Sequence, residues 1–499
     1  MSDQRLPSAD ELRLAASKRL DPEKRVELGQ FLTPSAIADF MAGLFERWPA
    51  QTRLLDPGAG IGSLTSGFVS RWLKNAPKGS ELELTAYEID PTLVEYLSDL
   101  LTQLAGATAD RGHTLKHSII ERDFIVEAAF SASFNGPRYT HVILNPPYRK
   151  ISTGSEHRRL LSRAGIETVN LYTAFLALSV AVCEPGGEIV AIVPRSFCNG
   201  TYYRPFRKWL MQRAAIRHIH VFGSRQKAFE DDDVLQENVI IHLAREAGQQ
   251  SPSISTSTDA TFDDLRQRRL PFEEIVNPSD PERFIHIPLG GSESGASLFR
   301  YALADLGLDV ATGPVVDFRL KDHWVHKPGE SSVPLLYSHH FRAGFQWPRE
   351  HKKPNGLALN DATRKWLMPR GWYTVTKRFS SKEERRRIVA YVVDPSKLPG
   401  AWYGFENHLN VIHRGKRGMP EELARGLAVF LNSTAVDLQF RKFSGHTQVN
   451  ATDLRTMKFP SVAELVRFGE WSKTQTDLTQ EAIDHFIDHQ ECQAGDKVA

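Results

Sequence analysis

Residues 54–63 read Leu54-Leu55-Asp56-Pro57-Gly58-Ala59-Gly60-Ile61-Gly62-Ser63, and this stretch decides the fold. Its apolar start is typical of a short buried strand, its glycines predict a turn, and a helix-compatible run continues through Trp72. Glycines let the backbone approach a ligand closely, and the N-terminus of the following helix attracts polar groups. The spacing is not that of the phosphate-binding G-x-x-x-x-G-K-S/T loop, because no Lys-Ser/Thr pair follows. A glycine-rich turn alone is weak evidence for a function, since any doubly wound protein can contain one.

Acidic residues follow the next predicted strands. Residues 83–87 form an apolar-polar alternation that ends in Glu88, the place where doubly wound folds bind ribose hydroxyls. Asp123-Phe124 precedes a further apolar run at residues 141–144. Because ligands of open α/β sheets bind at the carboxyl ends of the strands, we expect these groups to meet at one site.

Asn145-Pro146-Pro147-Tyr148 comes directly after the strand predicted at residues 141–144. Two prolines cannot continue a sheet ladder, so the strand must stop there in a rigid elbow. The elbow presents an amide side chain, a carbonyl and an aromatic ring. Together they suit a planar exocyclic amino group, with two acceptors for its two hydrogens and a ring for the base to lie on. A plain turn before a loop is the alternative for the tetrapeptide taken alone.

Composition is typical of a soluble intracellular enzyme. The 499 residues, 41% of them hydrophobic, can bury a large core and indicate two or three domains. Residues 1–24 are polar and charged, which does not fit a signal peptide, and no segment approaches the length of a membrane span. Cys183, Cys198 and Cys492 form no metal-ligand spacing, so we expect no metal site.

The formal net charge of +2 hides an uneven distribution. Residues 301–460 hold 25 Lys/Arg against 15 Asp/Glu, or +10, and residues 461–499 hold 3 against 8, or −5. A basic C-terminal half predicts phosphate contacts. The densest basic cluster has interleaved aromatic residues Trp372, Tyr373 and Phe379, and consists of Arg370, Lys377, Arg378, Lys382, Arg385, Arg386 and Arg387. A solvated helix face over residues 382–387 is an equally weighted alternative.

The motifs in this order resemble the S-adenosylmethionine-dependent DNA adenine-N6 methyltransferases of type II restriction-modification systems, with the gamma motif order. Further matching segments are Gly29-Gln30-Phe31-Leu32-Thr33-Pro34, Asn170-Leu171-Tyr172-Thr173-Ala174-Phe175 and Pro185-Gly186-Gly187-Glu188-Ile189-Val190. The resemblance covers residues 25–245 well. It continues in pieces at 312–319 and 444–450, which look like the recognition region of the PstI/BsuBI-like branch.

The resemblance implies a chemistry and a set of site residues. Asn145 and the Pro146 carbonyl would accept the two hydrogens of a flipped-out adenine amino group, Tyr148 would stack on the base, and Phe229 would form a second aromatic wall. Phe229 could instead be a core residue. The implied contacts of S-adenosylmethionine are Thr33 and Pro34 along its methionine part, Asp56 organising the turn of Gly58 and Gly60, Glu88 on the ribose, Asp123 on the adenine amino group, and Phe124 and Phe175 near that ring. Asp56 could also cap the following helix, and Phe175 could be core.

We therefore predict an α/β fold with a doubly wound, mostly parallel sheet and a C-terminal mixed α+β domain. The last strand of the sheet is expected at residues 239–243, followed by a linker or exposed edge at 248–263. The predicted parts are a helical lead-in (1–28), a catalytic domain (29–289), a target-recognition domain (290–460) and an acidic helical segment (461–499).

The predicted partners are double-stranded DNA and a separate cognate restriction endonuclease, in the cytoplasm of a bacterium or archaeon, with no membrane and a monomeric enzyme. Competing hypotheses are methylation of cytosine N4, RNA or a protein glutamine, an endonuclease fusion, and a non-catalytic DNA-binding module. Cytosine-N4 enzymes more often carry Ser at the position of Asn145, and glutamine methyltransferases lack a large basic C-terminal region. From the resemblance alone, the site CTGCAG is a guess.

Overall fold

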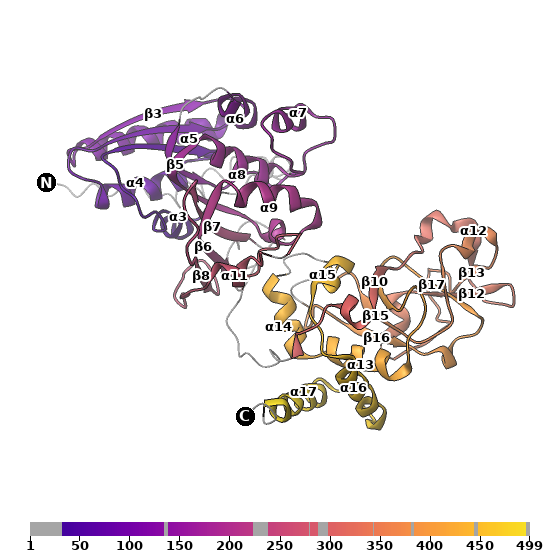
Figure 1. Ribbon diagram of the computed structural model, residues 1–499. Helices are drawn as coiled ribbons and strands as arrows, with labels where there is room; N and C mark the ends of the chain where they lie inside the picture. The colour runs from indigo at the N-terminus through magenta and orange to yellow at the C-terminus, as the bar shows by residue number, and fades with distance from the viewer. Residues whose placement is uncertain are drawn as a thin grey trace. The chain divides into compact units, whose positions relative to one another are not determined.

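The computed structural model describes residues 32–133, 138–222, 238–278, 280–287, 298–342, 344–380, 384–443 and 448–495. The chain divides into two compact units, residues 1–289 and 290–499 (Figure 1). The predicted lead-in at residues 1–28 and the predicted base wall Phe229 lie outside the described residues.

The first unit is built on a nine-stranded sheet with the order β3-β2-β1-β4-β5-β7-β6-β8-β9. The strands are β1 (Gln51–Pro57), β2 (Glu81–Tyr87), β3 (Thr114–Ile120), β4 (Tyr139–Leu144), β5 (Cys183–Pro194), β6 (Ala214–Phe222), β7 (Asn238–Arg245), β8 (Ser253–Ser257) and β9 (Arg266–Arg269). The first five strands in this order, β3, β2, β1, β4 and β5, pair in parallel with their neighbours. Strand β7 pairs antiparallel with both β5 and β6. The predicted doubly wound, mostly parallel α/β fold is confirmed.

Helices cover both faces of this sheet (Figure 1). One core joins α3 (Ser35–Ala42), α4 (Ser63–Asn75) and α5 (Pro91–Ala109) to one face. The other core joins α6 (Phe124–Ser133), α7 (Glu156–Arg163), α8 (Leu171–Val182) and α9 (Arg204–Met211) to the opposite face, with the short α11 (Phe272–Ile275) beside it. Strands buried on both faces explain the nearly continuous apolar sequence of β4 and β7.

Two further strands follow β7, so the prediction that residues 239–243 form the last strand was wrong. Strand β8 has the polar sequence Ser-Ile-Ser-Thr-Ser, which reads as a linker, yet it is mostly buried. Its hydroxyls find partners inside the protein, because Ser255 Oγ lies 2.6 Å from His218 Nε2 and 2.8 Å from His220 Nδ1 on the adjacent β6. Hydrogen bonds that side chains make across strands allow a polar segment to be buried.

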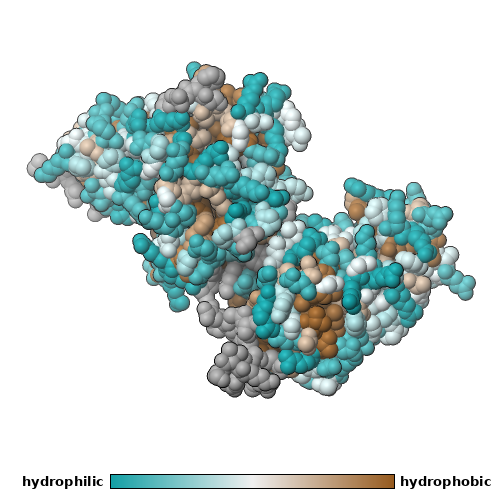
Figure 2. Space-filling model, in the orientation of Figure 1, coloured by the Kyte–Doolittle hydropathy of each residue, from teal (hydrophilic) through white to brown (hydrophobic). Residues whose placement is uncertain are grey.

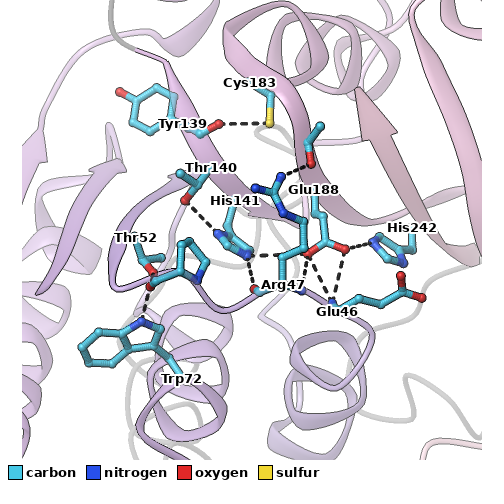
Figure 3. A network of polar contacts seen from close by, with 12 residues as sticks. Glu46, Arg47, Thr52, Trp72, Tyr139, Thr140, His141, Cys183, Glu188 and His242 are labelled. Atoms are coloured by element: carbon cyan, nitrogen blue, oxygen red, sulfur yellow. Dashed lines mark hydrogen bonds and ion pairs between the residues drawn. The ribbon is translucent and has the colours of Figure 1, made fainter. Parts of the chain in front are cut away.

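A buried polar network fixes the segment that joins α3 to β1 (Figure 3). The Glu188 side chain on β5 accepts hydrogen bonds from the backbone N–H groups of Glu46 and Arg47, the latter at 3.0 Å, and from His242 Nε2 at 3.1 Å. Burial opposes ionisation of Glu188, but the hydrogen bond and charge of His242 outweigh it, so the pKa of Glu188 is lowered. His141 Nε2 donates to the Arg47 carbonyl at 2.7 Å. The network thus holds α3 against the sheet.

The second unit combines two sheets with a helical layer. The strand orders are β10-β18-β15-β16 and β11-β13-β12-β17-β14. The strands are β10 (Asp309–Thr312), β11 (Trp324–Val325), β12 (Ser332–Leu336), β13 (Gly356–Ala358), β14 (Leu367–Pro369), β15 (Tyr373–Lys377), β16 (Ala390–Val393), β17 (Trp402–Phe405) and β18 (Leu409–His413). The helices are α12 (Asp361–Arg364), α13 (Glu421–Leu431), α14 (Thr434–Phe443), α15 (Ala451–Thr456), α16 (Val462–Thr474) and α17 (Gln480–Gly495). Leu465, Phe468, Ile483 and Ile487 join the core of this unit, so the segment 461–487 packs into it.

The basic cluster between Arg370 and Arg387 differs from its prediction. Residues 384–387 form no helix, and Arg387 is 1% exposed with its guanidinium over the Phe440 ring. Lys377 pairs with Glu384 at 2.8 Å. Arg370 and Arg385 are exposed. A charge count cannot separate a solvated arginine from one that packs its long side chain into a core.

Most of the face shown in Figure 2 is hydrophilic, and smaller apolar patches appear on both units. Among the described residues, no helix has the length and apolar character needed to cross a membrane. The described ranges also contain no group of three or more His, Cys, Asp or Glu arranged to hold a metal ion.

Candidate cofactor and acceptor site

A pocket of about 260 Å³ opens where the carboxyl ends of β1, β2 and β4 meet. It is lined by Leu32, Gly58, Gly60, Tyr87, Glu88, Ile89, Leu93, Arg122, Asp123, Phe124, Ile125, Asn145, Pro147, Arg149, His157, Leu171 and Phe175. The pocket thus brings together seven predicted site residues from separate parts of the chain: Gly58, Gly60, Glu88, Asp123, Phe124, Asn145 and Phe175.

The glycine-rich turn and Glu88 form one rigid side of the pocket. Gly58 and Gly60 have φ of 77° and 59°, a region that favours glycine. The Glu88 carboxylate accepts from the backbone N–H groups of Gly60 at 2.8 Å, Ile89 at 2.8 Å and Asp90 at 2.9 Å. Burial raises the pKa of Glu88, whereas these three N–H groups favour its ionised form. The three bonds hold the carboxylate in place and use three of its four lone pairs, so Oε2 keeps one lone pair for a ligand hydroxyl.

Asp56 lies behind the turn and is fully buried. Its Oδ2 accepts from Thr65 Oγ1 at 2.7 Å, while its Oδ1 has no partner among the described residues. Burial raises the pKa of Asp56 to about 7. Thr65 is the third residue of α4, so Asp56 ties the turn to this helix, although the N-cap residue itself is Gly62. The predicted role in organising the turn fits this geometry.

Asp123 and His157 form the adenine end of the predicted cofactor site. Asp123 Oδ1 accepts from the backbone N–H of Ile125 at 2.7 Å, and His157 Nε2 donates to Asp123 Oδ2 at 2.8 Å. Burial opposes ionisation of Asp123, but the hydrogen bond and charge of His157 lower its pKa overall. The hydrogen bond to Asp123 raises the pKa of His157. Nothing in the sequence pointed to His157, which comes from α7 and lies 34 residues from Asp123 along the chain.

The elbow after β4 holds Asn145 between two hydroxyl groups. Asn145 Nδ2 donates to Thr33 Oγ1 at 3.0 Å, and Tyr148 Oη donates to Asn145 Oδ1 at 2.9 Å. Tyr148 Oη also lies 3.3 Å from the Ile192 carbonyl, and its burial raises the pKa of this phenol. These contacts fix the orientation of the amide, with its nitrogen toward Thr33 and its oxygen toward Tyr148. Thr33 meets the elbow and does not line the pocket, and Pro147 lines it where Pro146 was expected.

Comparison with known proteins decides the family. The chain is 49% identical to the type II methyltransferase M.BsuBI of Bacillus subtilis, over 93% of this chain and 94% of that protein. It is 41% identical to the type II methyltransferase M.PstI of Providencia stuartii, over 94% of this chain and 95% of that protein. The chain belongs to this family of type II methyltransferases. The Eco57I restriction-modification methylase family also matches residues 72–229.

Likeness to solved structures is more distant. The cryo-electron microscopy structure of a DrdV–DNA complex is 12% identical, covers 94% of this chain and 60% of that one, and has a TM-score of 0.48.

S-adenosylmethionine is the cofactor of this type II methyltransferase. The pocket fits it on structural grounds. The fixed Glu88 carboxylate offers an acceptor, and the rings of Phe124 and Phe175, with centroids 5.0 Å apart, offer an apolar wall for the purine. Phe175 is 8% exposed, so it belongs both to the core and to the pocket. The roles of individual residues stay predictions.

Proposed function

We propose that this type II methyltransferase transfers a methyl group from S-adenosylmethionine to N6 of an adenine flipped out of duplex DNA. Membership of the family supports DNA methylation as part of a restriction-modification system. The adenine target rests on the elbow. The amide of Asn145 lies in the cofactor pocket, with its nitrogen bonded to Thr33 and its oxygen accepting from Tyr148 Oη. An amide oxygen has two lone pairs, so Oδ1 can accept a second hydrogen bond from an amino group.

The chain's own groups would act by position and charge. The adenine amino nitrogen is a poor nucleophile because its lone pair is delocalised into the ring. Acceptance of its two hydrogens by Asn145 Oδ1 and the Pro146 carbonyl would draw it toward tetrahedral geometry and free that lone pair. The bound cofactor supplies an electrophilic sulfonium methyl group, and transfer is a direct displacement in which the bond from carbon to nitrogen forms as the bond to sulfur breaks. An amino proton then leaves to solvent.

Tyr148 would support this step in two ways. Its hydroxyl steadies Asn145 through the 2.9 Å hydrogen bond, and its ring is the predicted stacking surface for the base. The ring is half-buried against the core that contains α6, α7, α8 and α9, which keeps it in one orientation. In this proposal the first unit binds the cofactor and performs the transfer, and the second unit recognises the DNA sequence. The enzyme acts as a monomer.

Expression in a host that lacks DNA methylation tests the proposal. Nucleosides from plasmid DNA should contain N6-methyladenine, and single-molecule sequencing should place it in one short site. Asn145→Ala, expressed at the same level, is the control and should leave the DNA unmodified. N4-methylcytosine in place of N6-methyladenine, or unmodified DNA with a methylated protein, would refute the adenine assignment.

A further inference from the structure

Asn238, the first residue of β7, is a buried amide without a partner. It is 5% exposed, and neither its Nδ2 nor its Oδ1 has a hydrogen-bond partner among the described residues. Most buried polar groups in native proteins are paired, and an unpaired one destabilises the fold. A whole unpaired amide therefore needs an explanation, such as a ligand that satisfies it.

The strand register places Asn238 at the edge of the sheet that carries the elbow. Leu144, the last residue of β4, pairs with Ala191 on β5, so Asn145 follows beside Ile192. On the other side of β5, Pro194 pairs with Asn238. Asn145 and Asn238 thus belong to strands on either side of β5, two strand spacings or about 10 Å apart, and Asn238 lies two residues further along β5. The two residues are therefore about 12 Å apart.

The alternation of side chains places both amides on the same face. Ile143, Ile192 and Ile240 belong to the core that contains α3 and α4. Their neighbours along each strand, such as Leu144, Ala191 and Val239, belong to the opposite core. Asn238 is two residues before Ile240, so its side chain lies on the α3 side. Asn145 lies on the same side, since its Nδ2 reaches Thr33 immediately before α3.

We propose that Asn238 hydrogen-bonds the ring edge of the flipped-out base while the amino group of that base lies on Asn145. An asparagine amide offers two donors and one acceptor, which can match ring nitrogens that act as acceptors. A separation of two strands on one face leaves room for one planar base between the two amides. Asn238 is therefore a base-binding residue. This inference rests on the proposed function only in that the acceptor is a nucleobase amino group.

The test compares two DNA duplexes and two proteins. The wild-type methylation site is first located by sequencing. One duplex carries the normal base at the methylated position and the other is abasic there. The affinity of the full-length chain for each is measured with S-adenosylhomocysteine bound. Asn238→Leu, which keeps the size of the side chain, should bind the normal duplex about tenfold more weakly and the abasic duplex as the wild type does.

Ser179→Ala is the matched control. Ser179 Oγ is also buried without a partner, but it lies in the last turn of α8, next to the start of β5 at the opposite edge of the sheet. This variant should bind both duplexes as the wild type does. Equal affinity of Asn238→Leu and wild type for the normal duplex would overturn the proposal and leave a bound water as the partner. An equal loss for both duplexes would also overturn it.

A measurement on the wild-type protein covers the case in which Asn238→Leu does not fold. If adenine is the methylated base, duplexes with 1-deaza-, 3-deaza- or 7-deazaadenine at that position each lack one ring nitrogen. Loss of affinity with one of them supports a ring-edge contact, and wild-type affinity for all three overturns it. The product analysis is separate, because a different methylated base would refute the adenine assignment while the abasic comparison still tests Asn238.

Discussion

At the scale of single residues, Thr33 helps to orient the Asn145 amide. It was predicted to lie along the methionine part of the cofactor, but its Oγ1 accepts from Asn145 Nδ2 at 3.0 Å. Thr33→Val keeps the shape and removes the acceptor, so the amide nitrogen loses this partner and the amide is held less firmly. We expect the single-turnover methylation rate at saturating cofactor to fall about tenfold or more, as loss of about 1.4 kcal/mol implies. Cofactor affinity should change little.

Thr33→Ser is the control for that variant, because it keeps the hydroxyl and should retain most of the rate. The opposite pattern, an unchanged rate with weaker cofactor binding, would contradict the orienting role and support the predicted contact of Thr33 with the methionine part of the cofactor.

His157 should make cofactor binding depend on pH. Its hydrogen bond to Asp123 raises the pKa of His157 above the usual 6.5, so the imidazole is protonated below that raised value and neutral above it. A protonated His157 competes for Asp123 Oδ2 and repels the cationic sulfonium cofactor. Affinity should therefore increase as the pH rises from 6.5 through the raised pKa. Calorimetric titration should show this slope for the wild type and a flat profile for His157→Gln.

S-adenosylhomocysteine, which lacks the sulfonium charge, should show a weaker pH slope with the wild-type protein. A slope that persists unchanged in His157→Gln would mean that another group causes it.

At the scale of elements, two glycines allow α13 and α16 to pack with their backbones in contact. A Cβ at Gly426 would lie 1.7 Å from the Leu465 carbonyl oxygen, and one at Gly469 would lie 1.8 Å from that of Glu422. Gly426→Ala must push the helices apart, so we expect the second unit to lose about 1–3 kcal/mol in free energy of unfolding. Gly106→Ala is the matched control: its Cβ meets nothing within 4 Å in α5, and it should stabilise by about 0.5–1 kcal/mol. Urea unfolding measures the free energy of unfolding of both variants. Equal changes in Gly426→Ala and Gly106→Ala would contradict close backbone packing of α13 and α16.

Sequence patterns predicted those elements whose local composition agrees with their final environment. The apolar run before Asn145 and the glycine turn before Ser63 are a strand end and a helix start in the structure. Strand β8 was missed because the histidines of β6 that pair with Ser255 lie far from it in the sequence. His157 and Asn238 were missed for the same reason. The bond of His157 to Asp123 and the burial of the unpaired Asn238 amide both depend on residues distant in sequence. Local periodicity carries no information on such pairings.

At the scale of the whole molecule, the excess of basic residues belongs to the second unit, but the residues expected to contact phosphate need revision. Arg387 and Lys377 are engaged inside the protein, whereas Arg414, Lys416 and Arg417 are exposed around a tight turn after β18. Gly415 and Lys416 have φ of 58° and 60°, as in a two-residue hairpin turn. Such a turn holds three cations together on a short, rigid loop.

Neutralising this turn should weaken DNA binding at every sequence alike. With Arg414, Lys416 and Arg417 changed to Gln, we expect the slope of log affinity against log salt to flatten by about 0.9 for each lost phosphate contact. The methylated sequence should stay the same, because phosphate contacts position the protein without reading bases. Lys473→Gln is the control, since Lys473 pairs with Glu422 on the neighbouring helix α13 and should leave the slope unchanged. A change in the methylated site would instead place the turn in a groove as a base reader, and an unchanged slope in the triple variant would move the phosphate contacts to other cations of the second unit.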